Sequence, residues 1–361
     1  MWIAVDAMGG DQAPASVVEG ARRAAAEDGA RILLVGHRDR LAPELRRLGL
    51  RPQATEAGGE GADDGVPIPV GPGALELVHA EDVVGMDEPA TTPLRKKPDS
   101  SIRRCVELVR AGRARALVTA GNTGAAMVAA KMVIGTVAGV ERPALAAVLP
   151  NEVARTVLLD VGANVDTRPS HLREFAVMGH CYAREVLGVE RPRVGLLSIG
   201  EEACKGSEVT REVFKILQAA GLEFAGNVEG SDVFSGRADV VVCDGFVGNA
   251  LLKSAEALAD LATRMLAKEL RASARTRLGL LLARPALERF RMNTDYAEYG
   301  AAPLLGLDGG CFIAHGRSNP RAIQSAVRRA AEFAQADLHH KIRDRLAELH
   351  SQEEKVLGQP A

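Results

Sequence analysis

One short segment of the chain has residue types that can bind an anion without an activated nucleophile. Gly121, Asn122, Thr123 and Gly124 follow an apolar run and precede a helix-like segment. Glycine lets the backbone approach an anion closely, and the free N–H groups at a helix start favour negative charge. The segment predicts a phosphate site, although an Asn–Thr pair that merely caps a helix has the same pattern.

A similar turn occurs later in the chain, where Asp244 and Gly245 lead to Gly248 and Asn249. The shared layout predicts a second half-site, with helix capping again as the alternative reading. Cys243 precedes this turn. A cysteine that ends a buried strand is more often a packing residue than a nucleophile.

The opening of the chain supplies candidate hydrogen-bond acceptors. Asp6, Gly9, Gly10 and Asp11 follow a strand-like run and precede Pro14, a pattern that also fits a plain tight turn. We expect the two aspartates to orient groups at the site.

Two further loops and a histidine complete the candidate set. Asp160 and Asn164 follow another apolar run, and Glu201 and Lys205 lie in a loop bounded by glycines. Lys205 is a reachable cation, although a solvated surface lysine is the alternative. His315 follows a strand-like run, so it is a candidate to face a cleft at the ends of the strands.

The elements that must position these residues alternate along the chain. Because most strand-like runs are nearly all apolar and do not alternate, we expect a largely parallel sheet covered by helices on both faces. The pattern predicts a doubly wound, three-layer αβα fold, in which ligands collect at the carboxyl ends of strands. The predicted strands are 2–6, 31–35, 114–119, 156–160, 193–199 and 239–243, and the predicted helices 15–28, 101–111, 124–135, 170–187, 207–220 and 249–268.

Residues 1–345 are predicted to form one domain. Within it, 51–73 is rich in Gly, Pro and acids and predicts a flexible surface insertion. A single charged helix is expected over 320–349, with a frayed tail at 350–361.

Residues 255–298 predict a protruding helical hairpin, because 268–292 interrupts the α/β pattern. Seven basic residues oppose two glutamates over 268–292. A leucine cluster at its centre is too short to span a bilayer but suits a membrane interface or a dimer contact. The arm residues singled out are Arg275, Arg277, Leu278, Leu280, Leu281, Leu282 and Arg284.

Several classes of protein are disfavoured by composition and missing motifs. The net charge is −2, which gives no reason to expect a nucleic-acid partner. Five scattered cysteines fit a reducing cytoplasm, and no export signal or transmembrane run is expected. No nucleotide-binding glycine motif, nucleophile elbow or metal-ligand spacing occurs at a suitable place, so no cofactor or metal is expected, and the His339–His340 pair is predicted to be inert.

Six motifs in order resemble the bacterial phosphate acyltransferase family. They are 3–11, 120–125, 159–166, 200–206, 244–249 and 299–306. Two departures stand out: Gln12 replaces the family's usual histidine, and Ala301 stands where the family often has glycine.

The resemblance implies an enzyme that transfers a fatty acyl group from acyl carrier protein to inorganic phosphate. It also implies a fold akin to the isocitrate and isopropylmalate dehydrogenases and the phosphotransacetylases. A homodimer is implied as well, together with peripheral attachment to the membrane, where another acyltransferase consumes the acyl phosphate. On this basis the predicted catalytic residues are Lys205, Asn122, Asn249 and Asp244.

Three other functions remain open from the residues. A phosphotransacetylase-like enzyme would use a coenzyme A thioester. A dehydrogenase of the related fold would bind a nucleotide. A non-catalytic scaffold for lipid enzymes would bind lipid without turnover.

Overall fold

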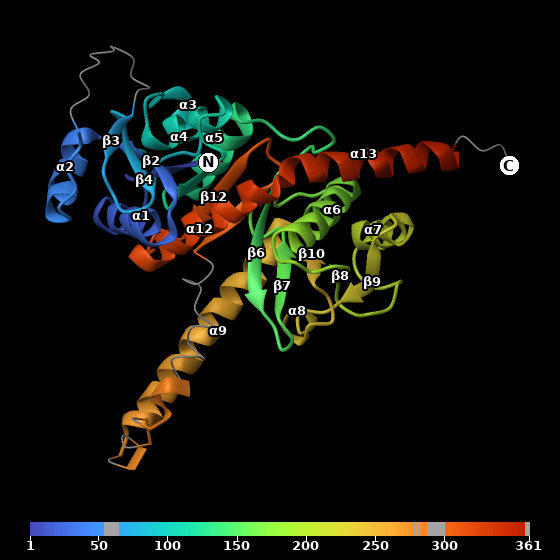
Figure 1. Cartoon of the computed structure of the whole chain (residues 1–361). Helices are drawn as coiled ribbons and strands as arrows, with labels where there is room; N and C mark the ends of the chain where they lie inside the picture. Colours follow the sequence, from blue (N-terminus) through green and yellow to red (C-terminus); the bar gives the residue numbers. More distant parts are fainter. Residues whose placement is uncertain (54–64, 274, 277–278, 281, 287–299, 358–361) are drawn as a thin grey trace.

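A computed structural model describes residues 1–53, 65–273, 275–276, 279–280, 282–286 and 300–357 of the 361-residue chain. Its centre is a twelve-stranded sheet in the order β3-β4-β2-β1-β5-β12-β11-β6-β7-β10-β8-β9 (Figure 1). The strands are β1 (Trp2–Asp6), β2 (Arg31–Gly36), β3 (Val66–Ile68), β4 (Ala74–His79), β5 (Ala116–Thr119), β6 (Ala144–Pro150), β7 (Arg155–Leu159), β8 (Arg193–Leu197), β9 (Glu223–Val228), β10 (Val240–Val242), β11 (Ala301–Leu305) and β12 (Gly310–Ala314).

The sheet consists of two parallel halves that run in opposite directions. Strands β4, β2, β1, β5 and β12 are parallel to one another, as are β7, β10, β8 and β9. Between them, β11 and β6 pair antiparallel with each other and with their outer neighbours. The carboxyl ends of the two halves therefore point in opposite directions along the sheet.

Helices cover both faces of this sheet. The helices are α1 (Ala15–Asp28), α2 (Arg38–Arg47), α3 (Thr92–Arg95), α4 (Ser101–Arg110), α5 (Thr123–Val133), α6 (Pro169–Glu185), α7 (Glu208–Ala219), α8 (Asp232–Ser235), α9 (Gly245–Arg271), α12 (Pro320–Ala336) and α13 (Leu338–Leu357). One hydrophobic core contains side chains of α1, α6, α7, α12 and α13, and a second contains side chains of α4, α5 and α8.

Alternate residues of the strands point into the two cores. In β1, Ile3 and Val5 belong to the core beneath α1 and α12, whereas Ala4 belongs to the core beneath α4 and α5. In β10, Val241 likewise points away from its two neighbours. Burial on both faces explains why these strands are apolar throughout. The expected α/β fold with a largely parallel sheet is confirmed.

The boundaries of the predicted elements mostly agree with the structure. β1 and α1 have the predicted limits, and the other predicted strands and helices differ by a few residues at their ends. The largest shift concerns α9, which begins at Gly245 rather than at Asn249. Asn249 therefore lies within the helix and not in the turn before it.

The expected single helix over 320–349 is wrong, because the chain breaks into α12 and α13 at Asp337. This residue has φ 51° and ψ 42°, a left-handed conformation that ends an α-helix. Asparagine and aspartate are the non-glycine residues that adopt it most readily. α13 then extends to Leu357, into the segment predicted to fray.

The predicted insertion at 51–73 contains an edge strand. β3 pairs antiparallel with β4, with Val66 opposite Leu77 and Ile68 opposite Leu75. Residues 54–64 of the insertion lie outside the described residues.

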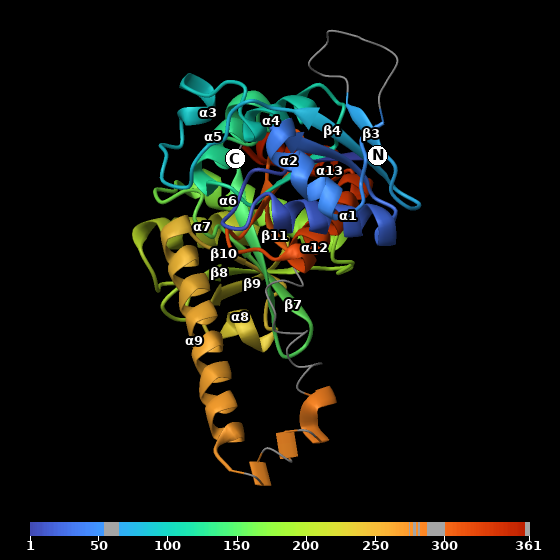
Figure 2. The same ribbon diagram turned by 90° about the vertical axis from the view of Figure 1, so that its left-hand side faces the viewer.

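Helix α9 projects from the body of the molecule as an arm (Figures 1 and 2). From Ala257 onward most of its described side chains are exposed. Of the arm residues singled out above, Arg277, Leu278 and Leu281 lie outside the described residues. In the part of the chain that the structure describes, no helix is both long and apolar enough to cross a membrane.

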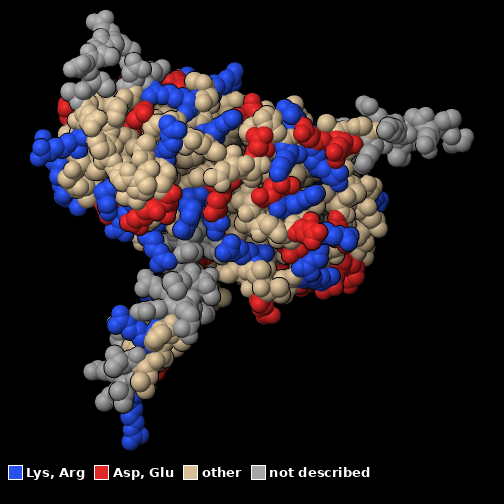
Figure 3. All heavy atoms as spheres, in the orientation of Figure 1, with Lys and Arg blue, Asp and Glu red and all other residues tan. Residues whose placement is uncertain are grey.

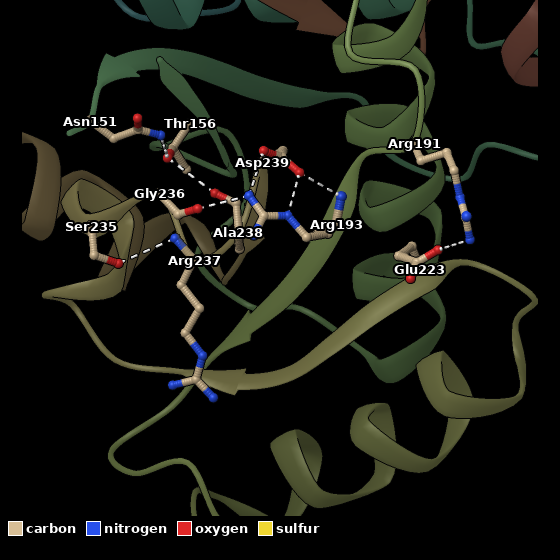
Figure 4. A network of polar contacts seen from close by, with 10 residues as sticks. All are labelled: Asn151, Thr156, Arg191, Arg193, Glu223, Ser235, Gly236, Arg237, Ala238 and Asp239. Atoms are coloured by element: carbon tan, nitrogen blue, oxygen red, sulfur yellow. Dashed lines mark hydrogen bonds and ion pairs between the residues drawn. The ribbon is translucent and has the colours of Figure 1, made fainter. Parts of the chain in front are cut away.

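A polar network fixes the start of the second parallel half. The guanidinium of Arg193, the first residue of β8, donates to both carboxylate oxygens of Asp239, each at 3.0 Å, and to the carbonyl of Gly236 at 2.7 Å (Figure 4). This fork geometry locks the strand starts in register. The amino ends of β8 and β10 are thereby tied together.

Candidate active site

The carboxyl ends of β1 and β5 are joined by a buried aspartate. Asp6 accepts a hydrogen bond from the Thr119 hydroxyl at 2.7 Å and another from the Met8 N–H at 3.1 Å. The Thr119 hydroxyl in turn accepts from the Gly121 N–H at 3.0 Å. Burial raises the pKa of Asp6, against the lowering effect of these donors. Asp6 thus braces the turn that holds Gly121.

The loop after β1 and the loop after β5 touch at a point where only glycine fits. A Cβ atom on Gly9 would lie 2.6 Å from the Gly121 nitrogen and 2.7 Å from an Asp6 carboxylate oxygen. A small cavity beside this contact is lined by Asp6, Gly9, Gly121 and Asn122, among others. The glycines predicted to serve close approach to an anion therefore also serve close packing of the loops.

Asn122 caps helix α5 and anchors a neighbouring loop. Its Oδ1 accepts from the Ala125 N–H at 3.0 Å, and its Nδ2 donates to the carbonyls of Gly85, Met86 and Glu88 at 3.3, 3.0 and 2.9 Å. The capping alternative thus describes the side chain of Asn122, which the sequence had suggested as catalytic. Its observed contacts give it a positioning role.

The start of α5 still offers donors to an anion. Thr123 and Gly124 are its first two residues, and the first N–H groups of a helix have no partner within the helix. The Thr123 side chain is exposed. The predicted phosphate-binding residues Gly121, Thr123 and Gly124 therefore lie together on a braced turn at a helix N-terminus.

The second turn cluster is built around Asp160, which follows β7. Its carboxylate accepts from the N–H groups of Leu145, Gly162, Ala163 and Asn164 and from the Asn164 amide, at 2.7 to 3.3 Å. Both side chains are buried, and burial raises the pKa of Asp160. These two predicted residues shape the loop.

Helix α9 packs against this loop. Asp244 caps the helix, since its carboxylate accepts from the Val247 N–H at 2.9 Å. A Cβ atom on Gly248 would lie 1.9 Å from the Asp160 carbonyl oxygen, so the helix can approach only with glycine there. Asn249 lies beside Gly162, since a Cβ atom placed on Gly162 would be 3.7 Å from the Asn249 side chain.

Cys243 is a packing residue. It is buried, its sulfur lies 3.6 Å from the Asp160 carbonyl oxygen, and burial raises the pKa of its thiol well above the ordinary range. A thiol held in this state is a poor nucleophile.

The loop between β8 and α7 carries the predicted cation. Lys205 is exposed and has no ion-pair partner among the residues that the structure describes. Glu201 instead forms an ion pair with Arg237 at 2.5 Å, and the amide of Asn227 donates to the Glu202 carbonyl at 2.8 Å. In Figure 4 the Arg237 side chain points away from the Arg193–Asp239 pair. Glu201 therefore holds the loop, which was not foreseen.

Two oxygen atoms beneath this loop lack hydrogen-bond partners within the described residues. They are Oγ of Ser198 and Oδ1 of Asn227, both buried. A Cβ atom on Gly206 would lie 2.9 Å from the Ser198 oxygen, so this oxygen lies directly beside the loop. Buried acceptors without donors are uncommon and mark a place where a donor can bind. The sequence had not singled them out.

The end of β12 brings Asp11 and His315 together. The Asp11 N–H donates to the Gly316 carbonyl at 2.8 Å. Burial, together with Arg317 and Lys253, lowers the pKa of His315, while Glu256 and Asp11 raise it. Lys253 and Glu256 belong to α9, one and two turns beyond Asn249. Helix α9 thus connects the two turn clusters.

A larger cavity of about 460 Å³ lies elsewhere, between α6 and α13. Most of its charged side chains are paired with one another, as in Arg191–Glu223 at 2.6 Å (Figure 4) and Arg345–Glu348 at 2.8 Å. Since these charges neutralise each other, the strand-end clusters remain the better candidates for an anion site.

Solved structures with a similar α/β fold include two phosphotransacetylases. The structure matches the EutD phosphotransacetylase from Staphylococcus aureus with a TM-score of 0.56 at 17% identity, covering 93% of this chain and 94% of that one. A phosphotransacetylase from Streptococcus pyogenes matches with a TM-score of 0.58, also at 17% identity and with the same coverage. At such identities the likeness concerns the fold.

The family is shown by closer relatives. The model of the family described as fatty acid synthesis protein matches residues 1–57 and 72–341. A phosphate acyltransferase of Nitratidesulfovibrio vulgaris is 48% identical over 341 residues, covering 94% of this chain and 93% of the relative, and one of Aquifex aeolicus is 46% identical over 340 residues, covering 94% and 95%. The chain belongs to this family, and the predicted resemblance to phosphate acyltransferases is confirmed.

Proposed function

We propose that the protein transfers a long-chain acyl group from acyl carrier protein to inorganic phosphate, releasing an acyl phosphate for phospholipid synthesis. The observation that most directly supports this proposal is the turn Gly121–Gly124 at the start of α5, which the Asp6–Thr119 hydrogen bond holds in place. The relatives in Nitratidesulfovibrio vulgaris and Aquifex aeolicus are phosphate acyltransferases, which supports the same reaction.

The chemistry suits a site without a catalytic dyad. Phosphate is already an anionic nucleophile, so the protein must hold it against the thioester and stabilise the oxyanion that forms. A thiol leaving group has a pKa of about 8.5, so acid assistance is useful but not obligatory. Phosphate oxygen attacks the thioester carbonyl, the carbon–sulfur bond breaks, and the thiolate takes up a proton.

We assign the binding of phosphate to the N–H groups of Thr123 and Gly124, with Asn249 as a further phosphate-binding side chain and Lys205 as the neutralising cation. Asp6, Asp160 and Asp244 act by shaping the turns, as their hydrogen bonds support.

The test is to supply purified protein with phosphate and either palmitoyl carrier protein or palmitoyl coenzyme A. Acyl phosphate formed mainly from the carrier thioester supports the proposal. A strong preference for the coenzyme A thioester would instead indicate the phosphotransacetylase-like alternative. No turnover with either donor, together with intact lipid binding, would indicate the scaffold, and binding of a nicotinamide cofactor the dehydrogenase.

We further propose a homodimer formed through the α9 arm. Leu258, Leu261 and Met265 follow one another at helical spacing and are 67, 46 and 60% exposed. An apolar stripe on a helix normally packs against protein. A second copy of the same arm offers a complementary stripe, as in an isologous interface.

The same arm could bring the protein to a membrane, and we propose a cytoplasmic, peripherally attached enzyme. Figure 3 shows Lys and Arg side chains along the arm. Leu282 near its tip is 77% exposed, and Arg275 is exposed as well. Basic and apolar side chains together favour an anionic bilayer surface, where the membrane enzyme that consumes acyl phosphate would receive it. The likeness to isocitrate dehydrogenase folds stays a prediction.

A further inference from the structure

Three potential metal ligands meet at the junction of α12 and α13. Asp337 ends α12 in the left-handed conformation, and His339 and His340 lie in the first turn of α13 (Figure 1). Adjacent residues on a regular helix do not share a face. Asp337 and His340 are three residues apart and do face each other, and the second carboxylate oxygen of Asp337 lies near the His339 ring.

The distances between the ligand atoms approach those of a metal site. Nδ1 of His340 lies 2.7 Å from one Asp337 oxygen, and Nε2 of His339 lies 3.4 Å from the other. One nitrogen or oxygen atom from each residue falls within 4.8 Å of the other two. Ligands bound tetrahedrally at about 2.0–2.1 Å from a zinc ion are about 3.3 Å apart. Small side-chain movements would therefore suffice.

The donor set determines the class of ion. Two imidazoles and one carboxylate suit zinc and its transition-metal neighbours better than calcium or magnesium, which prefer oxygen. Burial and the nearby His340 lower the pKa of His339, against the raising effect of Asp337. Asp308 and Arg115 also face this histidine. The His340 and Asp337 side chains are 43 and 54% exposed, which leaves room for entry and for water ligands.

The cluster is separate from the candidate active site. Arg115 immediately precedes β5, and Asp308 lies in the turn between β11 and β12, so both mark the amino ends of β5 and β12. Thr119 and His315 lie at the carboxyl ends of the same strands. A metal ion here would act on the helix junction and not on acyl transfer.

We propose that Asp337, His339 and His340 form a binding site for a divalent transition metal of the zinc class, which fastens α13 to the end of α12. The sequence alone had suggested an inert histidine pair. The Asp337 carboxylate, which lies near both rings, is what changes that reading.

The test uses full-length, tag-free protein with Cys204, the one exposed cysteine of the described residues, replaced by serine. Zinc is titrated calorimetrically above the ordinary pKa of histidine. We expect one saturable site, and His339→Ala or His340→Ala should weaken binding by more than the about 10- to 100-fold that losing an outer-shell partner costs. His79→Ala is the matched control, because His79 also lies 3.2 Å from a carboxylate, that of Glu81, but outside the cluster.

Two further readouts separate this site from adventitious binding. Zinc should raise the unfolding temperature of the parent protein and of His79→Ala but not that of His339→Ala/His340→Ala, whose fold is checked by circular dichroism. X-ray absorption at the zinc edge should show nitrogen and oxygen neighbours. The proposal is overturned if no saturable binding occurs, if the double variant binds as tightly as its parent, or if the neighbours are sulfur.

Discussion

At the residue scale, the candidate site separates groups that shape turns from groups that can meet a substrate. The carboxylates of Asp6, Asp160 and Asp244 all accept backbone or hydroxyl hydrogen bonds. Lys205 differs, since its side chain is exposed on a loop. A residue of that kind can contribute to the transition state without being needed for the fold.

The first prediction follows from this contrast. Replacing Lys205→Ala should lower kcat by about two to three decades, the about 2–4 kcal/mol that removing a transition-state donor costs. Binding of acyl carrier protein should change little. Lys215→Ala, an exposed lysine on α7, serves as the control. A loss of kcat no greater than that of the control would reduce Lys205 to a solvated surface residue.

The second prediction concerns the buried carboxyl of Asp6. Asp6→Asn disturbs buried hydrogen bonds and should lower the free energy of unfolding by about 1–3 kcal/mol. Because burial raises the pKa of Asp6 in the folded protein, the unfolded chain ionises first as pH rises. Wild-type stability therefore falls relative to the variant between the unfolded and the folded pKa.

The stability gap between wild type and Asp6→Asn should accordingly narrow as pH rises from acid toward neutral. Urea denaturation of both proteins over this pH series measures it. A gap that widens with pH would show instead that the hydrogen bonds outweigh burial and lower the pKa.

At the element scale, the sequence indicated where helices begin but not which long-range contacts the capping side chains make. Asn122 and Asp244 stand where caps were predicted as alternatives, and both side chains do cap helices. The three carbonyls that Asn122 also binds lie 34 to 37 residues away. No local pattern encodes such a contact. The ion pair of Glu201 with Arg237 was missed for the same reason.

The third prediction tests the turn at the start of α5. A Cβ atom on Gly124 would meet Ala90 at 3.2 Å, which the exposed loop can accommodate. Gly124→Val should place its methyl groups where an anion would approach, raising KM for phosphate at least about tenfold, or about 1.4 kcal/mol. The KM for the acyl donor should change less.

Thr123→Val is the companion variant, because it removes only the hydroxyl and leaves the backbone N–H groups. A smaller rise in its KM for phosphate would assign most of the binding to the backbone. An unchanged phosphate dependence in folded Gly124→Val would remove this turn from the site.

The fourth prediction concerns the exposed stripe on α9. Leu258→Glu/Met265→Glu should dissociate the homodimer, since each buried Leu or Met contributes about 1.5–3 kcal/mol. The dissociation constant should rise at least about a hundredfold, as measured by sedimentation velocity. Thr263→Glu adds one negative charge on another face of the helix and should remain dimeric. A wild-type protein that is monomeric at all concentrations contradicts the proposed interface.

At the scale of the whole molecule, the sequence showed the fold class but not the order of the strands. β10 is apolar throughout and β1 is apolar up to Asp6, so both were readable as buried strands. β6 begins Ala144-Leu145-Ala146-Ala147, and β11 contains Pro303, so neither has a clear strand pattern. These two strands join the halves of the sheet antiparallel. Their pairing depends on contacts over more than 150 positions of the chain, which residue spacing does not report.

The arm can serve dimerisation, membrane binding or both. Its apolar stripe begins near the body, whereas Leu280 and Leu282 lie near its tip. A dimer contact along the stripe would leave the tip free. Dimerisation and membrane binding are therefore compatible, and separate substitutions should remove each one.

The last prediction isolates the tip. Leu280→Glu/Leu282→Glu should reduce sedimentation with vesicles rich in anionic lipid, because it removes apolar contact and adds like charge near the surface. Ala283→Glu/Ala286→Glu carries the same charges on exposed neighbours and should lose only the electrostatic part, about 1 kcal/mol per basic residue offset. Both variants should remain dimeric by sedimentation velocity. If the leucine variant pellets as well as wild type, the tip does not bind lipid, and the arm serves the dimer alone.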